Sequence, residues 1–94
     1  MTKHTPRPWL VEGRTVYALN DDGYNRFSAL VQDAHTPGDE LEANARLMAA
    51  APELLKACEE ALDDLVDEDG VYFSGDESLV KQLRAAIAKA LGEA

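Results

Sequence analysis

The side chains in this sequence that are best suited to chemistry are those that bind nucleotides. Aromatic rings stack on nucleobases, an arginine guanidinium pairs with phosphate through two hydrogen bonds, and an asparagine amide reads a base edge or a ribose hydroxyl. All three types occur in the first half of the chain, so we expect them to form one ligand site. The predicted ligand-binding residues are Trp9, Arg14, Tyr17, Asn44 and Arg46.

Each of these residues also has a purely structural interpretation. The two aromatic residues are suited to a hydrophobic core, and Arg46 is placed to pair with Glu42 four residues earlier on a helix. Asn44 falls within a run of apolar residues, where an amide without a hydrogen-bond partner costs about 1–3 kcal/mol. It is therefore expected to bond either to a neighbouring helix or to a ligand.

Neither a catalytic nor a metal site is indicated. His4 and His35 are the only histidines, and no second His or Cys stands at the spacing of zinc ligands. Cys58, the single cysteine, is followed by two glutamates and lacks the electropositive setting that activates a thiol. The acidic stretch 67–77 is similar in composition to a calcium-binding loop. The position of the first calcium ligand in such a loop, however, is occupied by Leu65, which has no oxygen in its side chain. We predict a protein that is not an enzyme and that holds no metal or cofactor.

The elements that must position these residues begin with a small sheet. The β-branched and aromatic residues of PWLV and RTVYAL flank a turn at Glu12–Gly13, and Asp22–Gly23 is typical of a second turn. RFSALVQD follows as a third strand with alternate apolar residues on one face. The sequence therefore predicts a three-stranded antiparallel meander over residues 8–34, with one face that needs a cover.

Helical periodicity replaces the strand pattern after residue 38. Asp39 and Glu40 place negative charge at the start of a helical segment over residues 39–67, where the helix dipole favours it. Pro52 lies within that segment, so the helix must kink there or restart with the proline in its first turn. The apolar stripe that continues through the proline consists of Leu41, Ala45, Met48, Ala51, Leu55, Cys58, Leu62 and Leu65.

A last amphipathic pattern predicts a C-terminal helix over residues 76–91. Asp76, or Ser74 before it, is suited to cap its start, and Gly92 to end it. The expected fold class is α+β in a single domain, residues 1–94. It combines a small three-stranded antiparallel sheet with a proline-kinked helical pair and a C-terminal helix.

The charge distribution separates two parts of the chain. The formal net charge is −9, which disfavours non-specific binding to nucleic acid or to an anionic membrane, because both reward clustered Lys and Arg. Residues 1–37 carry four basic and four acidic groups, whereas residues 38–94 carry five basic and fourteen acidic groups. The first part therefore favours an anionic ligand and the second a basic partner protein.

Two segments resemble a known protein family. HTPRPW at residues 4–9 and ANARLMAAAPELLKA at residues 43–57 are similar to a widespread family of small phage and prophage proteins, which has an HTPGPW start and an NARLIAAAPELL core. Arg7 stands where that family commonly has glycine. The resemblance implies a phage origin and a compact accessory protein. Such proteins often counter bacterial immunity, and phage sponges of similar architecture sequester cyclic nucleotide or cyclic ADP-ribose signals as homo-oligomers.

Two functions follow as hypotheses. In the first, a homo-oligomer sequesters a nucleotide-derived immune signal in the predicted pocket without turnover. In the second, an acidic surface mimics nucleic acid and inhibits a basic host defence protein, as an anti-CRISPR protein would. A structural phage protein that only dimerises is a third interpretation. The predicted acidic row consists of Asp63, Asp64, Asp67, Glu68 and Asp69.

The expected location is the cytoplasm of the host bacterial cell. The single cysteine fits a reducing compartment, no stretch approaches the about 20 apolar residues of a membrane span, and the start has no apolar signal core. We expect neither membrane insertion nor direct binding of nucleic acid.

Overall fold

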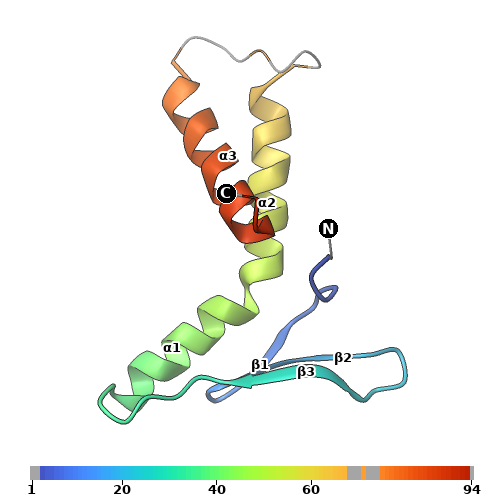
Figure 1. Ribbon diagram of the computed structural model, residues 1–94, viewed down its shortest axis with the longest axis vertical. Coiled ribbons are helices and arrows are strands. Elements are labelled where there is room, and N and C mark those ends of the chain that lie inside the picture. Colours follow the sequence, from blue (N-terminus) through green and yellow to red (C-terminus); the bar gives the residue numbers. More distant parts are fainter. Residues whose placement is uncertain (1–2, 68–70, 72–74, 94) are drawn as a thin grey trace. The chain divides into compact units, whose positions relative to one another are not determined.

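The computed structural model describes residues 3–67, 71 and 75–93, and it has the predicted α+β fold (Figure 1). By contacts between residues the chain divides into two compact units, Met1–Glu53 and Leu54–Ala94, which are described in turn. The described elements are β1 (Leu10–Glu12), β2 (Thr15–Leu19), β3 (Asn25–Leu30), α1 (Gly38–Ala49), α2 (Ala51–Leu65) and α3 (Glu77–Leu91).

The sheet of the first unit is the predicted antiparallel meander in the order β1-β2-β3. Gly13, with φ of 59°, makes the turn between β1 and β2, where a residue with a side chain would be strained. In the turn between β2 and β3, the Asn20 side chain accepts hydrogen bonds from the backbone N–H groups of Asp22 and Tyr24, each at 3.0 Å. The second turn lies where the sequence predicted it, whereas the first consists of Gly13 and Arg14, one residue later than the predicted Glu12–Gly13.

One face of the sheet is covered by α1, which contacts β1 and β2. The centre of this contact is Val16 of β2 against Ala45 and Ala49 of α1, all of them buried. Alanine has a small side chain, so the helix approaches the sheet closely, and Trp9 and Phe27 pack around the contact. The two segments that carry the family resemblance therefore meet in one small core.

The loop that leads into α1 is closed by Asp33. Its carboxylate accepts hydrogen bonds from the Thr36 hydroxyl at 2.7 Å and from the backbone N–H of His35 at 3.4 Å. These hydrogen bonds hold the pKa of the Asp33 carboxyl below its ordinary value of 3.8, and the bond from Thr36 has the larger effect. Desolvation of the carboxyl acts in the opposite direction and raises its pKa.

We expect the valine substitution Thr36→Val to raise the pKa of Asp33 towards 3.8, because it removes the hydroxyl donor but keeps the side-chain shape. A lowered pKa in the folded state stabilises the loop above the ordinary pKa, and this stabilisation is lost as the pH falls through the lowered value. An NMR titration of the Asp33 carboxyl measures both pKa values. An unchanged pKa in the variant would contradict this account of the loop.

The proline-containing segment restarts rather than kinks. The first helix, α1, ends at Ala49, Ala50 caps it, and α2 begins at Ala51 with Pro52 in its first turn, which is one of the two predicted arrangements. The predicted stripe is wrong at Met48, which is 42% exposed, and at Ala51, which is also exposed. Met48 lies about 60° around the helix from Ala45, whereas the buried residues of α1 follow a four-residue spacing that keeps them above the sheet. These buried residues are Leu41, Ala45 and Ala49.

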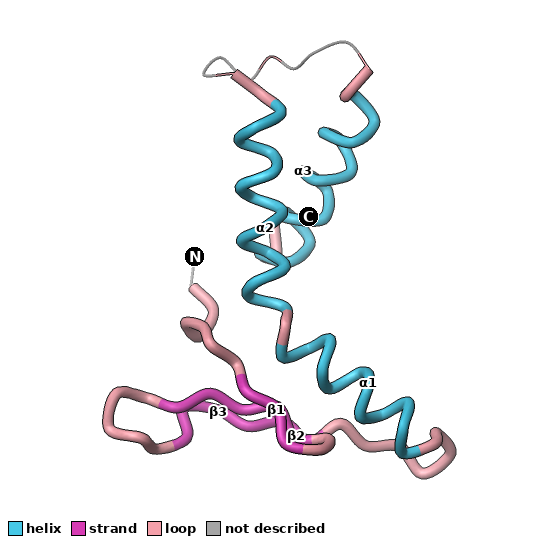
Figure 2. Tube along the Cα trace, turned by 180° about the vertical axis from the view of Figure 1, so that it is seen from behind, coloured by secondary structure: helices cyan, strands magenta, loops and turns pink. Residues whose placement is uncertain are grey.

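The second unit contains α3 and most of α2, drawn as helices in Figure 2. Val80 of α3 is fully buried, and Asp76 precedes the helix without a side-chain cap hydrogen bond, so the predicted capping by Asp76 is wrong. Ser74, the alternative cap, lies outside the described residues. Gly92 ends α3 as predicted, with φ of 76° and a hydrogen bond from the N–H of Glu93 to the carbonyl of Ala88 at 2.8 Å.

Candidate functional site

Trp9 lies on the helix-covered side of the sheet and is part of the core. Its indole N–H donates a hydrogen bond to the Thr5 carbonyl at 3.0 Å, and its ring meets Phe27 edge-on, with 5.0 Å between centroids and 74° between planes. His4 stands edge-on to the same indole at 6.2 Å. The HTPRPW segment thus folds onto itself and onto the core. Trp9 therefore takes the position of a core residue, which was the structural alternative to ligand binding.

Tyr17 lies on the opposite face of the sheet. Successive residues of a strand point to opposite sides, and Val16 and Ala18 on either side of Tyr17 are both buried towards α1. Trp9 and Tyr17 are therefore separated by the sheet, and they do not line one pocket as the sequence analysis expected. The period-two pattern of TVYAL places Tyr17 on the face opposite to Val16 and Ala18, whereas residue type alone groups Tyr17 with Trp9.

The other three predicted site residues are exposed and point in different directions. Arg14 lies in the turn between β1 and β2, where its carbonyl accepts a hydrogen bond from the N–H of Val31 at 2.9 Å. Asn44 and Arg46 are both exposed on α1. Two residues apart on a helix, they lie about 200° from each other around its axis. The structure does not bring the five residues together.

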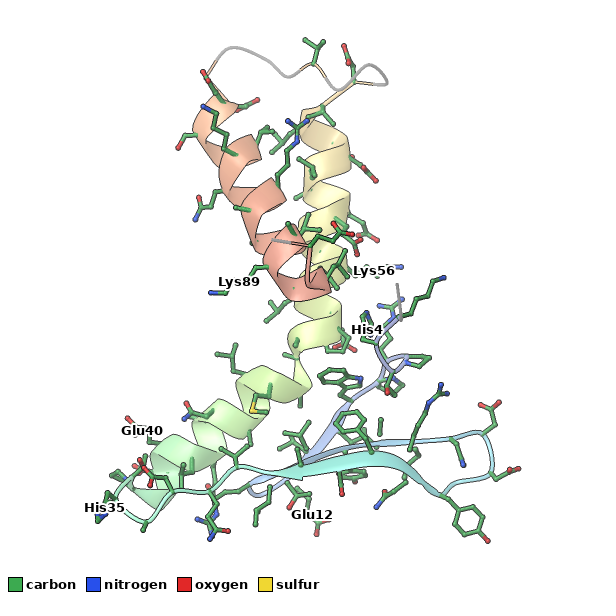
Figure 3. The ribbon with its side chains drawn as sticks, viewed as in Figure 1. His4, Glu12, His35, Glu40, Lys56 and Lys89 are labelled. Carbon is green, nitrogen blue, oxygen red and sulfur yellow. The ribbon has the colours of Figure 1, made fainter. Side chains whose placement is uncertain are left out.

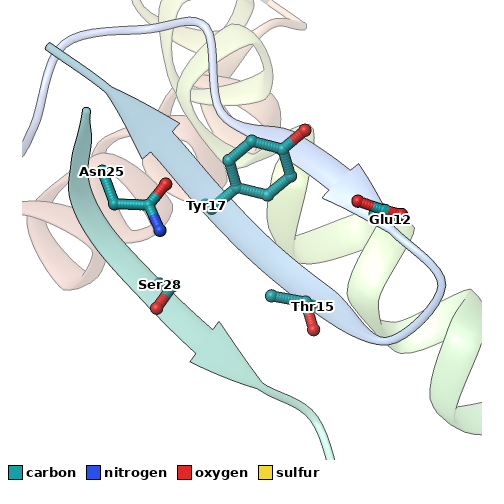
Figure 4. Close-up of a pocket in the computed structure, with 5 residues that line it drawn as sticks. All are labelled: Glu12, Thr15, Tyr17, Asn25 and Ser28. Atoms are coloured by element: carbon teal, nitrogen blue, oxygen red, sulfur yellow. The ribbon is translucent and has the colours of Figure 1, made fainter. Parts of the chain in front are cut away.

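The open face of the sheet carries a different set of polar groups around Tyr17 (Figure 4). They line a shallow hollow of about 500 Å³. The strand register places Glu12 opposite Thr15 and Tyr17 opposite Ser28, so the hollow extends over all three strands. Its lining residues are Glu12, Thr15, Tyr17, Asn25 and Ser28.

These five side chains combine an aromatic ring with four small polar groups. The hydroxyls of Thr15 and Ser28 donate and accept hydrogen bonds, the Asn25 amide does both at separate atoms, and an ionised Glu12 only accepts. Tyr17, on the central strand, is half-buried. Such a surface can hold a flat polar ring on the tyrosine and form hydrogen bonds with groups at its rim.

Only Tyr17 of this hollow was among the predicted site residues. Alternation of side chains along the first two strands predicts one shared face for Glu12, Thr15 and Tyr17. This is the face of the sheet that points away from Val16. The third strand gives no such signal, because a register shift at Ala18/Leu19 changes how β3 aligns with β2.

The histidines and the cysteine are not gathered into a site. His4 lies in the N-terminal segment and His35 in the loop before α1 (Figure 3), and Cys58 is half-buried on α2. Within residues 3–67, 71 and 75–93, no group of three or more His, Cys, Asp or Glu residues is placed to hold a metal ion.

The acidic surface of α2 is the other candidate region. Glu59, Asp63 and Asp64 are exposed, and Glu60 pairs with Lys56 at 3.7 Å. Asp67 is engaged in a turn, where its carboxylate accepts a hydrogen bond from the N–H of Val71 at 2.9 Å. The last two members of the predicted acidic row, Glu68 and Asp69, lie outside the described residues.

The fold and its open sheet face define a small α+β protein with a polar, aromatic surface suited to binding. The chain belongs to the family of Salmonella phage P22 protein Y8K6, whose family model matches residues 1–94. This confirms the resemblance to a small phage protein family. No curated protein and no solved structure gives a significant match.

Among the described residues, no helix is long and apolar enough to cross a membrane.

Proposed function

We propose that this phage protein is a non-enzymatic counter-defence protein that sequesters a nucleotide-derived immune signal on the open face of its sheet. The observation that carries the proposal is the position of Tyr17, half-buried at the centre of a hollow whose rim is formed by hydroxyl, amide and carboxylate groups. A nucleobase stacked on the ring would be within reach of several hydrogen-bonding groups. Sequestration needs tight binding and slow dissociation, and no catalytic group.

Arg14 is the residue best placed to contribute a phosphate contact. It lies in the turn that joins β1 to β2, between the two hollow residues Glu12 and Thr15 in sequence, and it is exposed. Its guanidinium is therefore available to a phosphate at that end of the hollow. Asn44 and Arg46 sit on α1, which contacts β1 and β2 from the covered side of the sheet, and they have no part in this version of the site.

Self-association is part of the proposal. Leu19 and Leu30 alternate with core-facing residues and so share the open face with the hollow, yet they are 46% and 60% exposed. The first unit also has a small core, in which three of the six buried residues that the structure describes are alanines. A second copy would cover part of this apolar surface and give a homo-oligomer around the bound signal.

The acidic surface of α2 favours a second candidate function, the inhibition of a basic host defence protein by charge mimicry. Its carboxylates Glu59, Glu60, Asp63 and Asp64 fall within six residues, which span about 7.5 Å at 1.5 Å per residue. That is at least the density of one charge per about 3.4 Å along a DNA strand. A basic nucleic-acid-binding groove is the partner that such a surface would fit.

Matched charge variants separate the two functions. We expect Arg14→Ala to weaken binding of a nucleotide signal by about 10- to 100-fold, the loss of one charge-assisted hydrogen bond, and to leave mimicry intact. The double variant Asp63→Asn/Asp64→Asn should disable mimicry and leave sequestration unchanged.

Native mass spectrometry of protein purified from cells with an active signalling defence measures the retained nucleotide and the oligomeric state together. A nucleotide-free parent protein that also fails to bind any member of a panel of cyclic nucleotides and cyclic ADP-ribose isomers would remove sequestration and leave the acidic inhibitor.

A further inference from the structure

The hydrogen-bonding polarity of the hollow restricts which part of a nucleotide it can hold. None of its five lining side chains is basic, and Glu12 carries a negative charge at its β1 side. A carboxylate accepts hydrogen bonds and repels a phosphate, so the ligand group beside Glu12 must supply donors and carry no negative charge. A pair of neighbouring hydroxyl groups meets both requirements, because the two carboxylate oxygens accept from both hydroxyls.

The register of the sheet places the other groups at suitable positions. Thr15 lies directly opposite Glu12 on the next strand, where side chains are about 5 Å apart, so a hydroxyl and a carboxylate face the same ligand group. Across the sheet, Asn25 and Ser28 lie on β3, about 10 Å from β1 at two inter-strand spacings. Tyr17 lies between the two sides, on the central strand. A base stacked on Tyr17 therefore has an amide and a hydroxyl at one side and the sugar at the other.

We propose that the hollow selects nucleotides with a free vicinal ribose diol, the ADP-ribose class, over cyclic nucleotides whose ribose hydroxyls are esterified to phosphate. Glu12 accepts hydrogen bonds from the diol, Tyr17 stacks on the base, and Asn25 and Ser28 contact the base edge. This inference rests on the proposed function, because it names the ligand class of the same site. It keeps phosphate groups off the Glu12 carboxylate itself, so the phosphate contact at this end of the hollow falls to Arg14 in the adjoining turn.

Calorimetric titration of the full chain with four probes tests the selection. The probes are ADP-ribose and AMP, which have the free diol, and 2′-deoxy-AMP and 3′,5′-cyclic AMP, which do not. We expect the diol-bearing probes to bind about 10- to 100-fold more tightly, the effect of hydrogen bonds to a charged group. The substitution Glu12→Gln should remove this preference, while Glu40→Gln, an exposed glutamate in the first turn of α1, should keep it.

The outcomes distinguish this inference from the function on which it rests. Equal affinity for all four probes, or tighter binding of 3′,5′-cyclic AMP, would overturn the diol selection and leave sequestration in place. A preference that persists in Glu12→Gln would overturn the role of Glu12. If none of the four probes binds, the diol selection is overturned, and the panel of cyclic nucleotides and cyclic ADP-ribose isomers then decides whether sequestration stands. Circular dichroism of each variant separates a loss of binding from a loss of folding.

Discussion

Replacing Trp9 by alanine is expected to destabilise the first unit by about 3 kcal/mol, the low end of the range for large aromatic residues in cores. The low end applies because Trp9 is half-buried. Its ring packs edge-on against Phe27 with the Val16–Ala45–Ala49 cluster beside it, and its N–H bonds to the Thr5 carbonyl. In a domain of this size, 3 kcal/mol lowers the melting temperature by roughly 12–24 °C.

Tyr24→Ala is the matched control for this prediction. Tyr24 is also aromatic but is 74% exposed in the turn between β2 and β3, so its removal should change the unfolding free energy by no more than about 0.5 kcal/mol. Thermal melts followed by circular dichroism compare the two variants. A Trp9→Ala protein as stable as Tyr24→Ala, but defective in ligand binding, would reverse the assignment of Trp9 to the core and return it to a ligand site.

The second large effect concerns Tyr17. We expect Tyr17→Leu to weaken nucleotide binding by about 5- to 150-fold, because base stacking on an aromatic residue contributes about 1–3 kcal/mol. Leucine keeps an apolar side chain at this strand position but removes the ring. Tyr17→Phe keeps the ring, so the affinity of this variant for the nucleotide should stay within a few-fold of that of the parent protein. Isothermal titration of the three proteins with ADP-ribose gives the affinities.

The control for Tyr17 uses the same exposed residue. Tyr24→Leu makes the same chemical change outside the hollow, since Tyr24 is not among its lining residues, and it should bind as the parent protein does. Equal weakening by Tyr17→Leu and Tyr24→Leu would point to a general effect on the β2–β3 hairpin. Unchanged binding in Tyr17→Leu would exclude the open face as the nucleotide site.

Much of the fold was predictable because its local signals are strong. The turn residues Gly13 and Gly23 both adopt positive φ, and they separate segments rich in β-branched and aromatic residues. Gly92 ends α3 in the left-handed conformation that glycine favours. Pro52 predicted either a kink or a restart of the helix, and the choice between the two depends on the backbone at Ala50, which no sequence pattern specifies.

The site was less predictable, because it depends on which strand face each residue occupies. Trp9 and Tyr17 are alike in chemical type, yet α1 covers the face that carries Trp9 and leaves the face that carries Tyr17 open. The hollow residues of β3 could not be placed from sequence, because the register shift between β2 and β3 is a tertiary feature. Asn44 is exposed, so no buried amide requires a partner there.

The central claim is that the open face of the sheet is the binding surface, and residue-resolved NMR tests it most directly. A ¹⁵N-labelled sample of the full chain is titrated with ADP-ribose, and the backbone amide shifts are followed. The account predicts saturable changes at Glu12, Thr15, Tyr17 and Ser28, with those of Glu59, Asp63 and Asp64 on α2 unchanged. A spectrum that does not respond, or changes confined to α1 and α2, would contradict it.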